Sequence, residues 1–424
     1  MQSDKQTIFG WTLYDWANSA FATTIMAAVL PVFYSTVAAG RLPANIASSY
    51  WGYTNTIAML AVAFSAPVLG AIADFKTAKK KFLGVFAAAG ILGSILLGFV
   101  GQGQWMLASA FYVIGRIGFA NANIFYDSLL PHITTAENRD QVSAQGYAVG
   151  YLGGGILLAI NLIMITKPQW FLIPDAESAI RYSFISVGLW WAVFSIPLFR
   201  WVAEPAAAVP QIELRPLQAG FMRLRYTFSH LRNYRQAARF LLAFWLYNDG
   251  VGTIIVMAVI FGAEIGISQT TLIGAILAVQ FAGAPFSIAF GRLAALIGAK
   301  RAIYIGLLVY MLIAAGGYFL KTDLHFWILA LAVATVQGGT QALSRSLFSR
   351  LTPPEKSAEF FGFYDVSNKF SGILGPAVFG LVSQFAGNSR LGIVALLVFF
   401  ICGFLVLTTV NVKDGEAAAF ALDD

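Results

Sequence analysis

Two aspartates lie inside long apolar segments of this 424-residue chain, each in a similar aromatic and amide setting. Asp15 stands in the sequence YDWAN at 14–18, and Asp249 in YND at 247–249. A carboxylate inside a bilayer-crossing helix costs about 2.5–3.5 kcal/mol on insertion scales, so it marks a functional site by default. One such group at the head of each half predicts a duplicated membrane protein whose polar side chains face an internal pathway.

The composition is that of an all-α polytopic membrane protein. Hydrophobic residues make up 58% of the chain and charged residues 11%, against about 25% charged in typical soluble proteins. Stretches of about 20 apolar residues, each long enough to cross a bilayer as a helix, recur along the whole length. The single cysteine, Cys402, excludes an intramolecular disulfide, and the first apolar run reads as a true span rather than a cleavable signal peptide. We predict about twelve spans, at 8–39, 46–73, 82–100, 104–130, 142–166, 182–203, 240–263, 269–291, 302–320, 325–348, 358–386 and 391–411.

The basic residues predict the orientation of these spans. With the N-terminus placed in the cytoplasm, 19 of the 27 lysines and arginines fall on the cytoplasmic side and five in outer loops. This bias fits the positive-inside rule. We therefore expect both termini in the cytoplasm, in the plasma (inner) membrane if the source is bacterial, and no nucleic-acid partner. Three basic residues lie within spans: Arg116, Arg345 and Lys369.

The longest connection divides the chain into an N-terminal bundle (1–203), a linker (204–239) and a C-terminal bundle (240–424). Apolar residues recur in the linker at three- and four-residue spacing from Leu217 to Leu231, between several arginines. This pattern favours an amphipathic helix on the membrane surface. The alternative is a linker that only tethers the two halves.

Matching sequence features recur in the two halves. Gly70 and Lys79 align with Gly291 and Lys300 at a constant offset of 221 residues, and prolines follow the fourth and tenth spans. The order of these anchors predicts a duplication of six plus six spans in parallel orientation.

The loop after the second span resembles the signature of the major facilitator superfamily, in which a glycine is followed four residues later by an aspartate and then by basic residues. Gly70, Asp74, Lys79 and Lys80 match it. The second copy keeps Gly291, Lys300 and Arg301 but has Ala295 in place of the acid. These groups could join neighbouring helices in one transport state, or the lysines could serve topology alone.

A narrower resemblance is to the vacuole-effluxer-like branch of that superfamily. It rests on YDWANSAF (14–21), FYDSLLPHI (125–133), SAQGYAVGYLGGG (143–155), QGGTQALSRSLFSRLTP (337–353) and FFGFYDVSNKFSGILGP (360–376). The resemblance implies a fold in which the first, fourth, seventh and tenth spans line a central cavity. It also implies a role in moving amino acids out of a compartment.

The charges agree with such a cavity, because the third, sixth, ninth and twelfth predicted spans carry none in their interiors. Arg116 and Asp249 are predicted to lie near the midplane. They could pair with each other as a structural or gating ion pair. Alternatively, Arg116 could hold a substrate carboxylate while Asp249 takes the amine or a coupling proton. Asp15 is expected nearer the cytoplasmic end, at an inner gate or in helix packing.

Further polar groups fall on the same or neighbouring spans. Asp365 and Lys369 are four residues apart, which favours a local helix pair over a substrate role. Arg345 and Asp127 lie near the cytoplasmic ends of their helices, where snorkelling or gate contacts would account for them. Uncharged hydrogen-bonding groups, for substrate or for helix packing, are supplied by Asn18, Asn121, Asn123, Gln337 and Gln341.

These features favour a secondary transporter of small organic solutes over an enzyme. The three histidines form no HExxH motif, no phosphate-binding GxxxxGK[ST] is present, and we expect no cofactor and no metal. We predict a functional monomer that moves an amino-acid-like solute by alternating access, with possible efflux and proton coupling. A channel, a transporter-fold receptor and a lipid mover remain alternatives.

Overall fold

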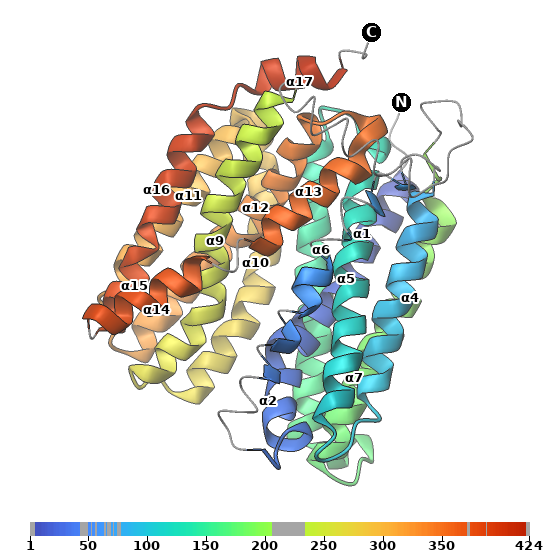
Figure 1. Ribbon diagram of the computed structural model, residues 1–424, viewed down its shortest axis with the longest axis vertical. Coiled ribbons are helices and arrows are strands. Elements are labelled where there is room, and N and C mark those ends of the chain that lie inside the picture. Colours follow the sequence, from blue (N-terminus) through green and yellow to red (C-terminus); the bar gives the residue numbers. More distant parts are fainter. Residues whose placement is uncertain are drawn as a thin grey trace.

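The computed structural model describes residues 5–42, 50, 51, 53–55, 57–62, 65, 69, 70, 72, 73, 78–205, 234–370, 374–386 and 388–420. Throughout these residues the regular structure is helical. Figure 1 shows most of the helices side by side along the long axis, with α1 beginning and α17 ending at the same end of the molecule. We call this the terminal end, and the opposite end the far end.

The first half begins with a span of unusual geometry. The predicted span 8–39 is helical over Lys5–Ala38 and consists of α1 (Lys5–Ala20), η1 (Phe21–Ala28), α2 (Leu30–Phe33) and η2 (Tyr34–Ala38). Both η1 and η2 have π-helical turns, and the Val29 N–H accordingly donates to the Thr24 carbonyl, five residues back, at 2.8 Å. Such widened turns are rare and are frequently found at functional sites.

The first half continues with α4 (Lys79–Leu97), α5 (Trp105–Ile133), α6 (Arg139–Thr166), η3 (Pro168–Phe171) and α7 (Ala176–Trp201). The second predicted span, 46–73, is described in part, and its described residues from 50 to 73 are helical. Glycines allow α4 and α5 to pack closely, because a Cβ on Gly118 would lie 2.3 Å from the backbone nitrogen of Gly90.

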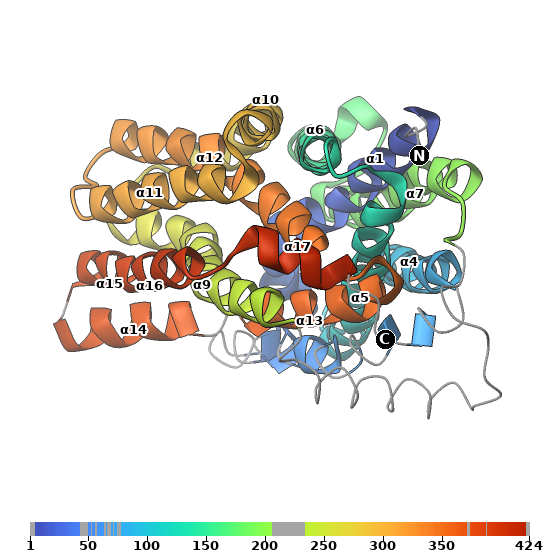
Figure 2. The ribbon, with the colours of Figure 1, turned by 90° about the horizontal axis from the view of Figure 1, so that it is seen from above.

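The second half consists of α9 (Arg235–Glu264), α10 (Gln269–Ile297), α11 (Ala299–Gly317), α12 (Asp323–Arg350), η4 (Pro354–Lys356), α13 (Ser357–Phe370), α14 (Leu374–Ala386), α15 (Ser389–Ala395), α16 (Leu397–Thr408) and α17 (Val412–Phe420). Within the described residues, the eleventh predicted span is two helices, α13 and α14, rather than one. The short α17 was not predicted. Figure 2 shows it lying across the terminal end, where it packs on α9 and α12.

Eight helices in the described part of the chain are long and apolar enough to cross a membrane. The helices α5 and α9, of 29 and 30 residues, correspond to the fourth and seventh predicted spans but are not among the eight. Both carry polar residues that the sequence singled out, including Arg116 and Asp249.

Two hydrophobic cores follow the two halves of the chain. Trp11, Phe21 and Trp191 belong to the core of the first half, and Tyr247, Tyr310 and Phe400 to that of the second. The halves meet where α6 packs on α10 and α12, and where α5 packs on α13. Most of the predicted linker, 206–233, lies outside the described residues, so the proposed amphipathic helix is untested.

Candidate functional site

A cavity of about 540 Å³ lies between the two halves of the protein. Its walls come from α1, η1, α5 and α6 on one side and from α9, α10, α12 and α13 on the other. Among the described residues that line it, none comes from α4, α7, α11 or α16. These four helices correspond to the spans that the sequence predicted to carry no internal charge. Each of them carries exposed apolar side chains, for example Val85, Leu189, Leu312 and Val398.

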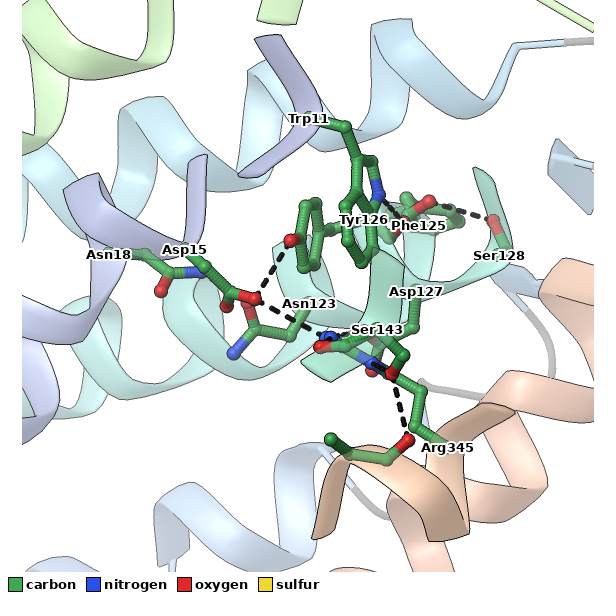
Figure 3. Close-up of polar contacts among 11 residues, drawn as sticks. Trp11, Asp15, Asn18, Asn123, Phe125, Tyr126, Asp127, Ser128, Ser143 and Arg345 are labelled. Carbon is green, nitrogen blue, oxygen red and sulfur yellow. Dashed lines mark hydrogen bonds and ion pairs between the residues drawn. The ribbon is translucent and has the colours of Figure 1, made fainter. Parts of the chain in front are cut away.

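An arginine closes the cavity toward the terminal end. The Nη1 of Arg345, on α12, lies 2.9 Å from Oδ1 of Asp127 on α5 and 3.4 Å from Oδ2 of Asp15 on α1. Its Nε and Nη2 donate to the side-chain and backbone oxygens of Ser143 on α6, each at 2.9 Å. Arg345 is only 2% exposed, so the guanidinium of one half is held by polar groups of the other (Figure 3). We call Arg345, Asp15, Asp127 and Ser143 the arginine lock.

Aromatic rings surround the guanidinium of the lock. Its carbon lies 4.5 Å from the ring centroid of Tyr147 and 4.9 Å from that of Trp11. Tyr126 stacks on Trp11 and donates its hydroxyl hydrogen to Asp15 at 2.8 Å. Arginine stacks on aromatic faces in addition to pairing with carboxylates. The planar guanidinium therefore fits this site better than a lysine ammonium would.

Further contacts between the halves lie beyond the lock, toward the terminal end. Asp140, on α6, accepts hydrogen bonds from Arg350 at 2.8 Å and from the Ser346 hydroxyl. Arg139 donates to the Ser349 carbonyl at 3.2 Å. Together with the lock, these contacts close the terminal end of the interface.

The charges that line the cavity are unevenly distributed along its axis. Three carboxylates, Asp15, Asp127 and Asp365, line the cavity together with Arg345, and two of them bind Arg345. The second lining arginine, Arg116, is eleven residues before Asp127 on the same helix, which corresponds to about 16 Å along the axis. We call Asp15, Asp127 and Asp365 the acidic floor. The same cavity thus contains the acidic floor and, separate from it, the cation Arg116.

Arg116 lines the cavity without an ion-pair partner among the described residues. Its Nη1 contacts the Met26 sulfur, and both residues line the cavity. Among the described residues, no carboxylate forms an ion pair with it. The guanidinium can therefore offer most of its donors to an anionic group in the cavity.

Asp249 lies midway along α9, as the sequence predicted, but it does not line the cavity. It is 1% exposed, and the residue of this pair that lines the cavity is its neighbour Asn248. Asp249 Oδ1 instead accepts the Gly375 N–H at 2.8 Å, at the start of α14. Consecutive helical residues point about 100° apart, which takes Asp249 away from the cavity when Asn248 faces it. Of the two alternatives for these residues, the ion pair between Asp249 and Arg116 is therefore absent from the described part of the structure.

A belt of amides lies between the acidic floor and Arg116. Asn18 donates to Asn123 at 2.6 Å, and both line the cavity together with Gln337 and Gln341. Asn121 differs, because it is fully buried and donates to the Ile117 carbonyl of its own helix. Asp365 lines the cavity, whereas the side chain of its predicted partner Lys369 lies outside the described part.

The predicted loop motifs take structural positions at the terminal end. A Cβ on Gly70 would lie 2.3 Å from the Ala358 carbonyl oxygen, so glycine permits close contact between the halves. Gly291 similarly allows α10 to approach Ala144 on α6. Arg301 is exposed, and Asp74 lies outside the described residues.

The lysines of the two motifs show the duplication in their contacts. Lys80 donates to the carbonyls of Phe199 and Val202 at the end of α7. Lys300 donates to those of Thr408 and Val410 at the end of α16, at 3.2 and 2.7 Å. Each lysine thus binds the last carbonyls of the final long helix of its half. The contacts pair Lys300 with Lys80, whereas the offset of 221 paired it with Lys79.

Sequence reasoning missed several residues of the site. Ser143, Tyr147 and Tyr151 lie in the segment SAQGYAVGYLGGG, which contributed only to the family resemblance. Gln280 also lines the cavity and carries no distinguishing sequence signal. A single polar residue in an apolar run does not reveal which face of the helix it occupies.

The arrangement of the helices in two halves around a central cavity is that of the major facilitator superfamily. The human organic anion transporter MFSD10 (TETRAN) has a TM-score of 0.73 at 14% identity, over 95% of this chain and 98% of that one. The transporter FucP in its outward conformation has a TM-score of 0.69 at 12% identity, over 96% of this chain and 98% of that one. At these identities the similarity shows the fold. This fold and a 39% identical relative, an MFS-type transporter, together show that the protein is an integral membrane transporter of this superfamily and not an enzyme.

Within that class, residues 3–419 match the model of the family "Vacuole effluxer Atg22 like", and the chain belongs to this family. The uncharacterized MFS-type transporter YxiO of Bacillus subtilis is 39% identical over 404 residues, which is 94% of each chain. Autophagy-related protein 22 of Eremothecium gossypii is 22% identical over 482 residues, covering 99% of this chain and 93% of that protein. The family resemblance noted in the sequence motifs is confirmed.

Proposed function

We propose that this protein is a secondary active transporter of zwitterionic, amino-acid-like solutes. The observation that carries the proposal is the placement of Arg116, a cation with no carboxylate partner among the described residues, in the same cavity as an acidic floor and an amide belt. A carboxylate suits a guanidinium, and an ammonium suits carboxylate and amide oxygens.

The dimensions of the cavity favour binding in stages. Arg116 and Asp127 are about 16 Å apart along α5, which is farther than one small zwitterion can reach. We propose that Arg116 holds the carboxylate while the amide oxygens of Asn123 and Gln337 receive the amine. The acidic floor would take up the amine later, when the solute moves toward the terminal end.

We propose that this is the outward-facing state, with the terminal end in the cytoplasm. The distribution of 19 cytoplasmic and five outer basic residues supports that orientation, and the arginine lock closes the same end. Because the relative YxiO is bacterial, we propose the cell membrane as the location. The name of the matching family supports efflux as the direction of transport.

We propose Asp249 as the first carboxylate to test for proton coupling. It is 1% exposed, and its Oδ2 has no hydrogen-bond partner among the described residues. A buried carboxylate with an unsatisfied oxygen is stabilised by taking a proton. Because it lies off the cavity, its protonation would act through the contact with α14 rather than on the solute directly.

Counterflow in proteoliposomes tests the transport proposal. Proteoliposomes that contain the purified protein and are preloaded with an unlabelled zwitterionic amino acid should take up the labelled amino acid with saturable kinetics. Its anionic and cationic analogues should compete poorly for this uptake. A non-saturating current would favour a channel. Binding without counterflow would favour a receptor, and movement of a labelled lipid between leaflets would favour a lipid mover.

A further inference from the structure

A cluster of polar side chains at the terminal end joins Lys79 and Ser357, which are buried, and His132, which is half-buried. Lys79 Nζ lies 2.9 Å from His132 Nε2 and 2.6 Å from Ser357 Oγ, and His132 Nε2 lies 3.3 Å from the same hydroxyl. Lys79 is 4% exposed and Ser357 is fully buried. None of the three lines the central cavity, so the solute-binding groups do not account for this cluster.

The hydrogen bonds determine the protonation state of the histidine. Ser357 donates its hydroxyl hydrogen to the Ser128 carbonyl at 3.1 Å, so its oxygen accepts from Lys79. His132 Nε2 faces the same ammonium and must accept from it, which requires an unprotonated nitrogen. The ring also makes a hydrogen bond with the Pro354 backbone. Since proline has no N–H, the ring is the donor there, and His132 is neutral with its proton on the other nitrogen.

The cluster connects the two halves of the protein. Lys79 and His132 belong to the first half, whereas Ser357 and Pro354 belong to the second. Opening the terminal end must therefore separate His132 from Ser357 and Pro354 and admit water to the ring. The closed interface requires a neutral imidazole, and the opened one does not.

The charges around His132 all oppose its protonation. His132 is the penultimate residue of α5 and lies beyond the predicted span 104–130, outside the membrane-spanning part. Burial, the ammonium of Lys79 on α4 and the guanidinium of Arg139 on α6 lower its pKa to about 3, against an opposing contribution from the Pro354 hydrogen bond. Ser357 presents a hydroxyl, and no carboxylate of the described residues is among the charges that act on the ring.

We propose that His132 is a proton-sensitive latch that holds the terminal end closed when neutral and releases it when protonated. Protonation would place an N–H against the Lys79 ammonium, so the closed state loses the bond and gains a repulsion. The inference rests on the alternating-access class of the protein and is independent of the solute proposed above.

The direction and size of the effect follow from linkage. His132 has its lowered pKa only in the closed state. The stability that the neutral imidazole gives the closed state over the open one is therefore fully present above the ordinary histidine pKa of about 6.5, and it is lost as the pH falls toward 3. Between pH 7.5 and 5.5 the ratio of closed to open protein should fall about tenfold.

Distance measurements between spin labels test the latch without any substrate. Labels at Ala136→Cys and Thr408→Cys, both exposed near the terminal end of opposite halves, report its opening in a Cys402→Ser background. In nanodiscs, the short-distance population should fall as the pH is lowered from 7.5 to 5.5. In His132→Gln the fall should be markedly smaller, because the glutamine amide can accept from Lys79 and donate to Pro354 without titrating.

Two further variants keep the test decisive. His325→Gln removes an exposed histidine at the opposite end of α12 and should retain the full pH response. Lys79→Met removes the repelling ammonium and should reduce the response, which gives a second reading if His132→Gln fails to fold. A wild-type distance distribution that does not change with pH, or an unaltered response in His132→Gln, would overturn the proposal.

Discussion

Arg345 Nη1 and Asp127 Oδ1 lie 2.9 Å apart, although their residues are 218 positions apart in the chain and belong to different halves. The pair is protected from solvent, because the Arg345 side chain is 3% exposed and that of Asp127 18%. Together with Asp15 and the Ser143 oxygens, it holds the terminal end of the cavity closed. Only one of the two alternating-access states can contain this contact.

Replacing Arg345 with glutamine should open the terminal end. Removing one partner of a buried ion pair costs on the order of 3 kcal/mol, here reduced somewhat by the partial exposure of the carboxylates. The open population should therefore rise by one to two orders of magnitude. Spin labels at Ala136→Cys and Thr408→Cys measure this shift directly.

The matched control for that variant is Arg301→Gln, which removes an exposed arginine from the same end of the molecule. It should leave the distance distribution unchanged. The open population of Arg345→Lys should lie between those of Arg345→Gln and Arg301→Gln. An ammonium keeps the positive charge but loses the planar set of N–H donors and the stacking on aromatic rings. Equal behaviour of Arg345→Gln and Arg301→Gln would show that the lock does not stabilise the closed state.

Arg116→Gln should weaken solute binding if Arg116 holds the substrate carboxylate. A hydrogen bond to a charged group contributes about 1.5–3 kcal/mol, so the apparent Kd should rise by about 10- to 150-fold. Thermal shift with zwitterionic solutes and counterflow in proteoliposomes provide the measurement. The loss of affinity should be smaller for analogues with an amidated carboxyl group. An equal loss for both forms would show that Arg116 does not bind the substrate carboxylate.

Asp249→Asn should separate transport from proton coupling. The amide oxygen can still accept the Gly375 N–H that Asp249 binds at 2.8 Å, so the fold should be retained. Counterflow should continue, while accumulation driven by a pH gradient should be lost. If both activities remained at the wild-type level, Asp249 would not be the coupling group.

Lys80→Met and Lys300→Met should have similar effects on stability. Each lysine donates to carbonyls at the end of the last long helix of its half, and such a contact is worth about 1 kcal/mol. We expect a fall of a few degrees in the Tm of the detergent-purified protein in each case, with solute affinity unchanged. A large effect in one half alone would show that the two lysines are not equivalent.

The sequence predicted the fold class and the spans that avoid the cavity because apolar length and charge distribution are local properties. Spans without internal charge became α4, α7, α11 and α16, which contribute nothing to the described lining of the cavity. The motif lysines were recognised as a pair, but their register was off by one residue. The break between α13 and α14 and the helix α17 were missed.

The sequence by itself determined which residues lie within the membrane-spanning part, because burying a charge in lipid is costly wherever it occurs. Only the tertiary structure decided which of them meet. Asp249 and Arg116 have similar depth in the sequence, yet one faces α14 and the other the cavity, because rotation about a helix axis is set by packing against neighbours. Arg345 likewise became the centre of a lock because two distant halves come together around it.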